Sequence, residues 1–90
     1  MKKWYLYVVE CSDGSLYTGI TTNIERRINE HNYGDRGAKY TRSRRPVRLL
    51  KTKEYPSHSR AASMERKFKK LNRNKKLEIL NESRGFDYLG

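Results

Sequence analysis

The sequence has few residues that could bind a soft metal or form cross-links. It contains one cysteine, Cys11, and two histidines, His31 and His58, among 90 residues. One cysteine excludes an intrachain disulfide and cannot by itself form a zinc site, and two histidines are too few for a metal cluster. We expect Cys11 to be a buried strand residue, because no histidine stands near it in the sequence to activate it as a nucleophile.

Long hydrophobic runs are also missing. Residues 1–4 lead directly into a short alternating apolar run without a cleavage site, so we expect no signal peptide, no membrane span and a cytoplasmic location. Hydrophobic residues make up 34% of the chain and most of its aromatics are tyrosines, which predicts a thin core. A chain of this length has room for one domain, which we expect over residues 1–82, with residues 83–90 as a frayed tail.

Acidic residues are scarce beyond the first third of the chain. The net charge is +11, from 21 Lys and Arg against 10 Asp and Glu. Residues 1–30 hold four bases and four acids, residues 31–60 hold nine against two, and residues 61–90 hold eight against four. Such a field attracts a polyanion, and counterion release favours nucleic-acid binding. The alternative is a basic surface that is only solvated.

The order of the expected elements indicates an α+β domain in which one sheet carries the helices. Residues 12–15 form a turn inside a hairpin, Thr22 and Glu25 fit a capping box, and residues 34–46 form a polar, basic loop or short helical turn. The expected strands are residues 4–11, 16–21 and 47–55. The expected helices are residues 22–33, a long one with its apolar stripe over 61–71, and a short one around 77–80.

Two tyrosines of the hairpin are candidates for chemistry. Tyr5 and Tyr7 share one face of the first strand because side chains alternate, and Tyr17 can face Tyr7 across the pair, beside Gly19. Their hydroxyls could then hold a water or a phosphate oxygen. The alternative is ordinary cross-strand packing of tyrosines.

The first helix carries Arg27 and His31, four residues apart and therefore on one face. A guanidinium held near the sheet could bind a phosphate bidentately and stabilise the charge that develops there. His31 could orient Arg27 or contact the phosphate. The alternative is that Arg27 reaches solvent or pairs with Glu25 or Glu30.

Glu65 is the exceptional carboxylate in a helix rich in lysine and arginine. A hard cation such as Mg²⁺ is often held by one or two carboxylates, completed by waters and phosphate oxygens. Glu65 is therefore a candidate metal ligand. The alternative is an intrahelical ion pair with Arg66 or Lys69.

Together these motifs resemble the GIY-YIG nuclease superfamily. The two namesake triplets correspond to Tyr5-Leu6-Tyr7 and Tyr17-Thr18-Gly19, the helix pattern to residues 23–31, and the glutamate motif to residues 61–67. The resemblance covers nearly the whole chain and is greatest to small stand-alone, single-domain bacterial proteins of uncharacterised function. Tyr5 replaces the usual glycine of the first triplet and Thr18 the usual aliphatic residue of the second, and neither change removes a tyrosine of the site.

The resemblance implies a small three-stranded antiparallel sheet flanked by helices, and a metal-dependent endonuclease that hydrolyses DNA phosphodiesters. It gives catalytic positions to Tyr7, Tyr17, Arg27 and His31, and makes Glu65 the ligand of one Mg²⁺ or Mn²⁺ ion. In this hypothesis Tyr17 is the general base, Tyr7 positions the water or a phosphate oxygen, and Arg27 stabilises the pentavalent charge.

The expected partner is DNA, including branched or damaged DNA. The basic segment after the first helix supplies the predicted phosphate contacts, which are Lys39, Arg42, Arg44, Arg45 and Arg48. Nothing in the sequence provides readout of bases in a groove. Two alternatives stay open: a non-catalytic nucleic-acid-binding module of the same fold, and a nuclease subunit directed by a targeting protein.

Overall fold

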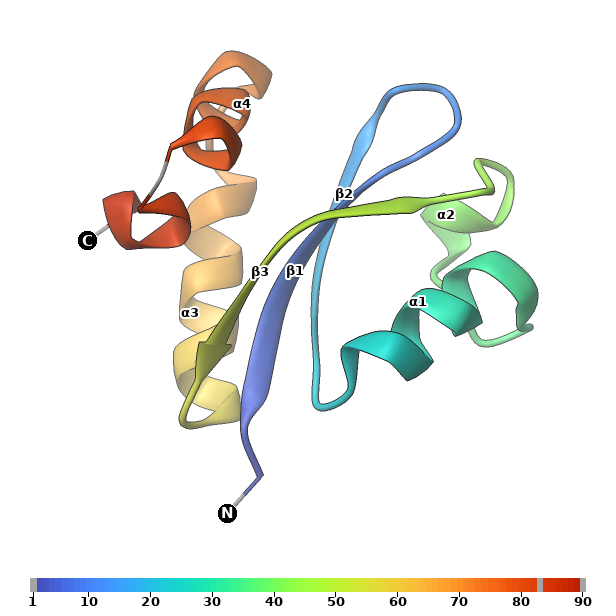
Figure 1. Cartoon of the computed structure of the whole chain (residues 1–90), viewed down its shortest axis with the longest axis horizontal. Helices are drawn as coiled ribbons and strands as arrows, with labels where there is room; N and C mark the ends of the chain where they lie inside the picture. The colour runs from blue at the N-terminus through green and yellow to red at the C-terminus, as the bar shows by residue number, and fades with distance from the viewer. Residues whose placement is uncertain (1, 83, 90) are drawn as a thin grey trace.

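A computed structural model describes residues 2–82 and 84–89 of the chain. Residues 34–46, predicted as a loop or short helical turn, contain one turn of helix, α2. Within the described residues no helix is both long and apolar enough to cross a membrane. The elements in chain order (Figure 1) are β1 (Trp4–Glu10), β2 (Leu16–Thr21), α1 (Ile24–Tyr33), α2 (Lys39–Arg42), β3 (Arg48–Tyr55), α3 (His58–Lys69), α4 (Arg73–Asn81) and the 3-10 helix η1 (Gly85–Leu89).

The three strands form one antiparallel sheet in the order β2-β1-β3. This confirms the predicted α+β fold with a three-stranded antiparallel sheet and flanking helices. The β1–β2 turn closes through Asp13, whose carboxylate accepts hydrogen bonds from the backbone amide and the hydroxyl of Ser15, at 3.0 and 2.6 Å. Gly14 has a φ of 84°, a left-handed conformation that glycine adopts without steric cost.

The central strand β1 is buried on both faces. Leu6 and Val8 point to a core formed with α3, α4 and η1, whereas Tyr7 and Val9 point to a second, smaller core against α1. Figure 1 shows α1 and α2 on one side of the sheet and α3 and α4 on the other. The alternation of side chains along β1 therefore separates an apolar support from the face that carries Tyr7.

Helix α1 begins one residue later than the predicted capping box. Asn23 is its N-cap, and the side chain of Asn23 accepts a hydrogen bond from the amide of Arg26 at 2.9 Å. Thr22 does not cap the helix. The side chain of Ser57 similarly caps α3 and that of Asn72 caps α4, which satisfies amides that the first helical turn leaves free.

The start of β1 is joined to the start of α3 by two rings. The indole of Trp4 lies edge-on to the imidazole of His58, with ring centroids 4.6 Å apart. This contact fixes the N-terminal end of α3 against the central strand.

The chain after α4 differs from the predicted frayed tail. Phe86 is 1% exposed and packs edge-on against Phe68, with ring centroids 5.4 Å apart. Lys53 of β3 pairs with Asp87 at 2.8 Å. Residues 85–89 are therefore held in place by apolar contacts and an ion pair, while residues 83 and 90 of that predicted tail lie outside the described residues.

Candidate active site

The ring of Tyr7 lies directly over Gly19. The two residues are partners in the β1–β2 ladder, and Tyr17 pairs with Val9, one diagonal step from Tyr7. A side-chain carbon added at Gly19 would lie 2.5 Å from the Tyr7 hydroxyl oxygen and 2.7 Å from the ring carbon that bears it. Gly19 continues the strand and leaves space for the Tyr7 ring, which is 1% exposed.

The Tyr7 hydroxyl begins a buried chain of hydrogen bonds. Its oxygen lies 2.8 Å from Nε2 of His31, and Nδ1 of His31 lies 2.8 Å from Oγ1 of Thr41. The Thr41 hydroxyl in turn donates to the carbonyl oxygen of Ala38 at 3.0 Å. His31 and Thr41 are both fully buried.

This chain determines which nitrogen of His31 carries the proton. The single hydroxyl hydrogen of Thr41 is directed to a carbonyl, which can only accept. Oγ1 of Thr41 must therefore accept from Nδ1–H of His31, and Nε2 of His31 must accept the hydroxyl hydrogen of Tyr7. Burial and the nearby charge of Arg27 lower the pKa of His31 to about 4, with Arg45 adding to the effect, so the ring is uncharged at neutral pH.

Arg27 joins this chain from α1. Its Nε donates to the Tyr7 hydroxyl oxygen at 3.4 Å, and its Nη1 donates to the carboxylate of Glu30 at 3.0 Å and to the carbonyl of Arg36 at 2.8 Å. Burial raises the pKa of Tyr7 to about 12 against the opposing effect of Arg27. The Tyr7 hydroxyl is thus un-ionised at neutral pH.

Tyr17 lies at the outer side of the same face and is partly exposed. Its ring meets the His31 ring edge-on, with centroids 5.3 Å apart, and stacks with the Tyr40 ring at 6.0 Å and an interplanar angle of 23°. The guanidinium carbon of Arg44 lies 4.0 Å from the centroid of Tyr40. Within residues 2–82 and 84–89 the Tyr17 hydroxyl has no hydrogen-bond partner, so it is available to a ligand.

Glu65 approaches from α3, along the edge strand β2. Its side chain is 20% exposed and its carboxylate pairs with Nζ of Lys69 at 3.2 Å, which is one of the two ion pairs considered from sequence. The charges of Tyr17 and Glu65 add to the rise in the pKa of Tyr7 that burial causes. The structure therefore brings Tyr7, Tyr17, Arg27, His31 and Glu65 into one region.

Residues 3–78 match the model of the GIY-YIG catalytic domain. The chain belongs to the GIY-YIG family. A UPF0213 protein of Syntrophus aciditrophicus is 48% identical over 83 residues, which cover 92% of this chain and 95% of the relative. A UPF0213 protein of Streptococcus sanguinis is 52% identical over 80 residues, which cover 89% and 91%. These relatives confirm the likeness to small single-domain proteins of uncharacterised function.

Solved structures agree with this assignment. The solution NMR structure of the UPF0213 protein of Bacillus halodurans has 44% sequence identity and a TM-score of 0.59, over 97% of this chain and 90% of that chain. The NMR structure of a protein from E. faecalis has the same identity and TM-score, over 88% and 84%. GIY-YIG domains form a nuclease-like family whose substrates are nucleic acids and whose nucleases generally depend on a metal ion.

The donor set for a metal in this GIY-YIG domain is small. In the part of the chain that the structure describes, no group of three or more His, Cys, Asp or Glu side chains could hold a metal ion. A single carboxylate, that of Glu65, fits a hard cation only where waters and substrate phosphate oxygens complete the coordination. The chemistry of these residues therefore fits Mg²⁺ or Mn²⁺ bound together with a nucleic acid.

Arg45, one of the five predicted phosphate contacts, forms its hydrogen bonds within the domain. Its guanidinium donates to the backbone carbonyls of Glu30, His31 and Gly34. These bonds hold the loop after α1 against the end of that helix. Arg45 is therefore a structural residue in this arrangement.

The other four predicted phosphate contacts lie at the surface. Lys39 is exposed and has no hydrogen bond or ion pair among the residues that the structure describes. Arg42 and Arg48 each have one protein oxygen as a partner, and Arg44 has two, but all three keep further N–H groups for a ligand. The partners are the Asp35 carbonyl for Arg42 (3.0 Å), Asp13 (3.0 Å) and the Tyr40 carbonyl (2.8 Å) for Arg44, and Glu10 for Arg48 (2.8 Å).

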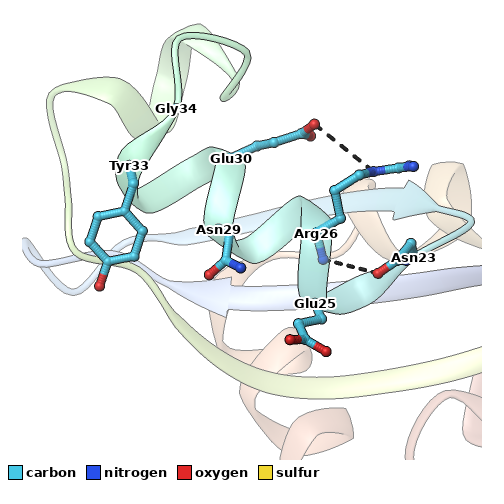
Figure 2. A pocket seen from close by; sticks show the side chains of 7 residues that line it. All are labelled: Asn23, Glu25, Arg26, Asn29, Glu30, Tyr33 and Gly34. Carbon is cyan, nitrogen blue, oxygen red and sulfur yellow. Dashed lines mark hydrogen bonds and ion pairs between the residues drawn. The ribbon is translucent and has the colours of Figure 1, made fainter.

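A hollow of about 630 Å³ lies on the outer face of α1 (Figure 2). It contains acids and a base side by side, and Glu30 pairs there with Arg26 at 3.9 Å while also pairing with Arg27. The Glu30 side chain therefore connects this hollow with Arg27. The lining residues are Asn23, Glu25, Arg26, Asn29, Glu30, Tyr33 and Gly34.

Sequence reasoning missed two residues of α2, Thr41 and Tyr40. Thr41 is hydrogen-bonded to His31, the partner of Tyr7, and Tyr40 stacks on Tyr17. Only the bases of residues 34–46 were considered there. A threonine and a tyrosine in a basic loop give no local signal of burial. The distance along the chain from Tyr7 to Thr41 is too long for a spacing rule to reveal their connection.

Proposed function

We propose that this protein is a metal-dependent endonuclease that hydrolyses DNA phosphodiesters. The observation that carries the proposal is that Tyr7 and Tyr17 lie on one face of the sheet in different environments, with Arg27 held against Tyr7. Tyr7 has its hydroxyl fully hydrogen-bonded to His31 and Arg27, whereas the Tyr17 hydroxyl is open to a ligand on the same face. The Tyr7 hydroxyl therefore holds the site together, and the Tyr17 hydroxyl is available to react.

Arg27 is the proposed phosphate-binding group. Tyr7 and Glu30 hold its Nε and Nη1, so the guanidinium is oriented before the substrate arrives. Nη2 of Arg27 has no partner within residues 2–82 and 84–89. A pre-oriented cation that contacts a phosphate oxygen stabilises the charge that grows on it during displacement.

Tyr17 is the proposed general base. Tyr17 first gives its hydroxyl proton to solvent, and its oxygen then accepts a proton from the attacking water. The water oxygen forms a bond to phosphorus, and the opposite P–O bond breaks as the leaving oxygen takes a proton from solvent. A metal ion held by Glu65 and the phosphate would supply Lewis-acid stabilisation of the displaced charge.

Tyr7 has a narrower role than the sequence suggested. Its hydrogen is directed to His31, so its oxygen can accept from Arg27 or from a water but cannot donate to a phosphate oxygen. We therefore assign Tyr7 and His31 to positioning Arg27 and the water. His31 does not contact the phosphate, because its ring is fully buried.

The test is a nicking assay on plasmid, branched and single-stranded DNA with Mg²⁺ or Mn²⁺. Arg27→Ala, Glu65→Ala and Tyr17→Phe should each lower cleavage at least about a hundredfold. Arg26→Ala and Glu25→Ala are matched controls, because they make the same changes on the outer face of α1 and should cleave like wild type. Cleavage by Glu65→Ala at the wild-type rate would contradict the assignment of Glu65 as the metal ligand.

The choice of DNA substrates and a partner titration separate the remaining alternatives. Binding without cleavage of any substrate by wild type would replace the enzyme with a non-catalytic nucleic-acid-binding module. Cleavage that appears only with a second protein would identify a subunit with a targeting partner. A cytoplasmic location, where the chain meets DNA, belongs to the same proposal.

A further inference from the structure

A small cavity of about 240 Å³ lies at the edge of β2, beside Glu65. Four elements contribute to it: β2, α2, α3 and α4. Its lining contains two ammonium groups and two phenols but no carboxylate. The lining residues are Leu16, Tyr17, Thr18, Tyr40, Lys69 and Lys76.

The two lysines of this cavity have few partners among the described residues. Lys69 is half-exposed and pairs only with Glu65, its neighbour one helical turn away, at 3.2 Å. Nζ of Lys76 lies 5.8 Å from the Phe68 ring centroid. Neither ammonium donates to a backbone carbonyl in the described part of the chain, whereas Arg45 makes three such bonds. Both can therefore turn to a ligand at low cost.

The chemistry of the cavity favours one class of ligand. Two lysines line this hollow and no carboxylate does, which favours an anionic ligand there. Lysine binds phosphate as a point charge, and the hydroxyl of Tyr40, the other tyrosine of the lining, can donate to a phosphate oxygen. We propose that Lys69 and Lys76 form a subsite for a DNA backbone phosphate next to the phosphate that Arg27 contacts, and this rests on the proposed function.

Lys69 links this subsite to the metal position. In the free protein its ammonium neutralises Glu65, the carboxylate assigned to the metal. A phosphate that attracts Lys69 removes this cation from Glu65, which leaves the carboxylate for a divalent ion. DNA binding and metal binding therefore help each other, by the same factor in both directions.

The first test measures DNA binding without cleavage. Wild type, Lys69→Gln, Lys76→Gln and the control Lys67→Gln are titrated into a short labelled DNA in EDTA, single-stranded and duplex, at several salt concentrations. Lys67 lies on α3 outside the cavity lining, so the control makes the same charge change. Each cavity variant should lower the slope of log affinity against log salt by about 0.9 on duplex or 0.7 on single strands. The control should keep the wild-type slope.

Equal slopes for all four proteins would overturn the subsite. The subsite would also be overturned if both cavity variants bound inorganic phosphate more weakly while their DNA binding did not change. That result would indicate a site for free phosphate. These readouts do not require cleavage. If wild type is inactive but the cavity variants have reduced slopes, the nuclease proposal is refuted and the subsite is supported. If wild type is active but the slopes are unchanged, the nuclease proposal is supported and the subsite is refuted.

The second test measures metal binding alone, by titration with Mn²⁺ in the absence of DNA. Removal of an ammonium beside the carboxylate should tighten Mn²⁺ binding to Lys69→Gln by roughly three- to tenfold. Lys67→Gln should bind Mn²⁺ like wild type. Adding DNA should tighten Mn²⁺ binding more in wild type than in Lys69→Gln. Unchanged Mn²⁺ affinity in Lys69→Gln would refute the link through Lys69.

Discussion

Tyr7 and Tyr17 face the same side of the sheet but are held differently. Tyr7 is buried and hydrogen-bonded to His31 and Arg27. Tyr17 is held by ring contacts, and its hydroxyl has no partner among the described residues. The same contrast separates buried Thr41 from Glu65, whose one partner is a flexible lysine. Tyr7 and Thr41 belong to an inner layer that is fixed by folding. Tyr17 and Glu65 belong to an outer layer, to which the proposed function assigns contacts with DNA and a metal ion.

The largest expected effect that tests this contrast is the pH dependence of the free energy of unfolding. The pKa of His31 is lowered from 6.5 to about 4 in the folded protein, so below pH 6.5 the unfolded chain binds a proton that the folded chain does not. The contribution of neutral His31 to the free energy of unfolding is therefore fully present above pH 6.5. About 3 kcal/mol of it is lost as the pH falls towards 4.

Urea unfolding of wild type and His31→Gln between pH 4 and 7 measures this loss. Carboxylates such as Asp13, whose pKa a hydrogen bond from Ser15 lowers, affect both proteins equally. The difference between the two curves therefore isolates His31. Parallel curves for His31→Gln and wild type would contradict a neutral buried ring.

Gly19→Ala should have the next largest effect. The new methyl group overlaps the Tyr7 ring and hydroxyl, which are enclosed by the α1 core, so we expect a loss of about 2 kcal/mol in the free energy of unfolding. Thr52→Ala, at the exposed partner of Tyr7 on β3, should change stability by less than about 0.5 kcal/mol. Similar losses at both positions would show that the ring is not tightly enclosed.

Thr41→Val should cost about 1–2 kcal/mol, because it removes the acceptor for Nδ1–H of buried His31. The proton of His31 is then expected to move to Nε2, where Tyr7 can accept it. Nitrogen-15 NMR of the imidazole measures the change directly, and Thr41→Ser should retain the wild-type spectrum. Protonation at Nε2 in the wild type would reverse the assigned direction of the whole chain.

Tyr7→Phe and Tyr17→Phe compare the two layers directly. The first removes the donor to buried Nε2 of His31 and should cost about 1 kcal/mol. The second removes a hydroxyl without a partner and should change stability by less than about 0.5 kcal/mol, although it should abolish cleavage. Chemical denaturation of both variants at pH 7 gives the comparison, and equal losses would remove the distinction between the layers.

The sequence predicts what is local. Alternation of side chains located β1 and β2, and the turn residues around Gly14 located the hairpin. The α1 cap was placed one residue early because Thr22 and Asn23 are both good caps, and only the backbone decides between them. Glu65 and Lys69 were paired correctly as one option, since they are one helical turn apart.

Contacts between distant segments could not be predicted. The functional importance of Thr41 depends on how residues 35–46 return across α1, which no periodicity describes. Arg45 reads as a phosphate contact in sequence because nothing local shows the three carbonyls that surround it. Phe86 lies after a polar stretch and reads as part of a loose end, but its burial depends on Phe68 of α3.

The contact between Trp4 and His58 provides an intrinsic optical signal. Trp4 is the only tryptophan of the chain, and its ring touches the first residue of α3, the helix that carries Glu65 and Lys69. Its fluorescence therefore reports the seating of this helix on the sheet and not the tyrosine face. A spectral change when DNA and metal are added would show, without any label, that α3 shifts against the sheet.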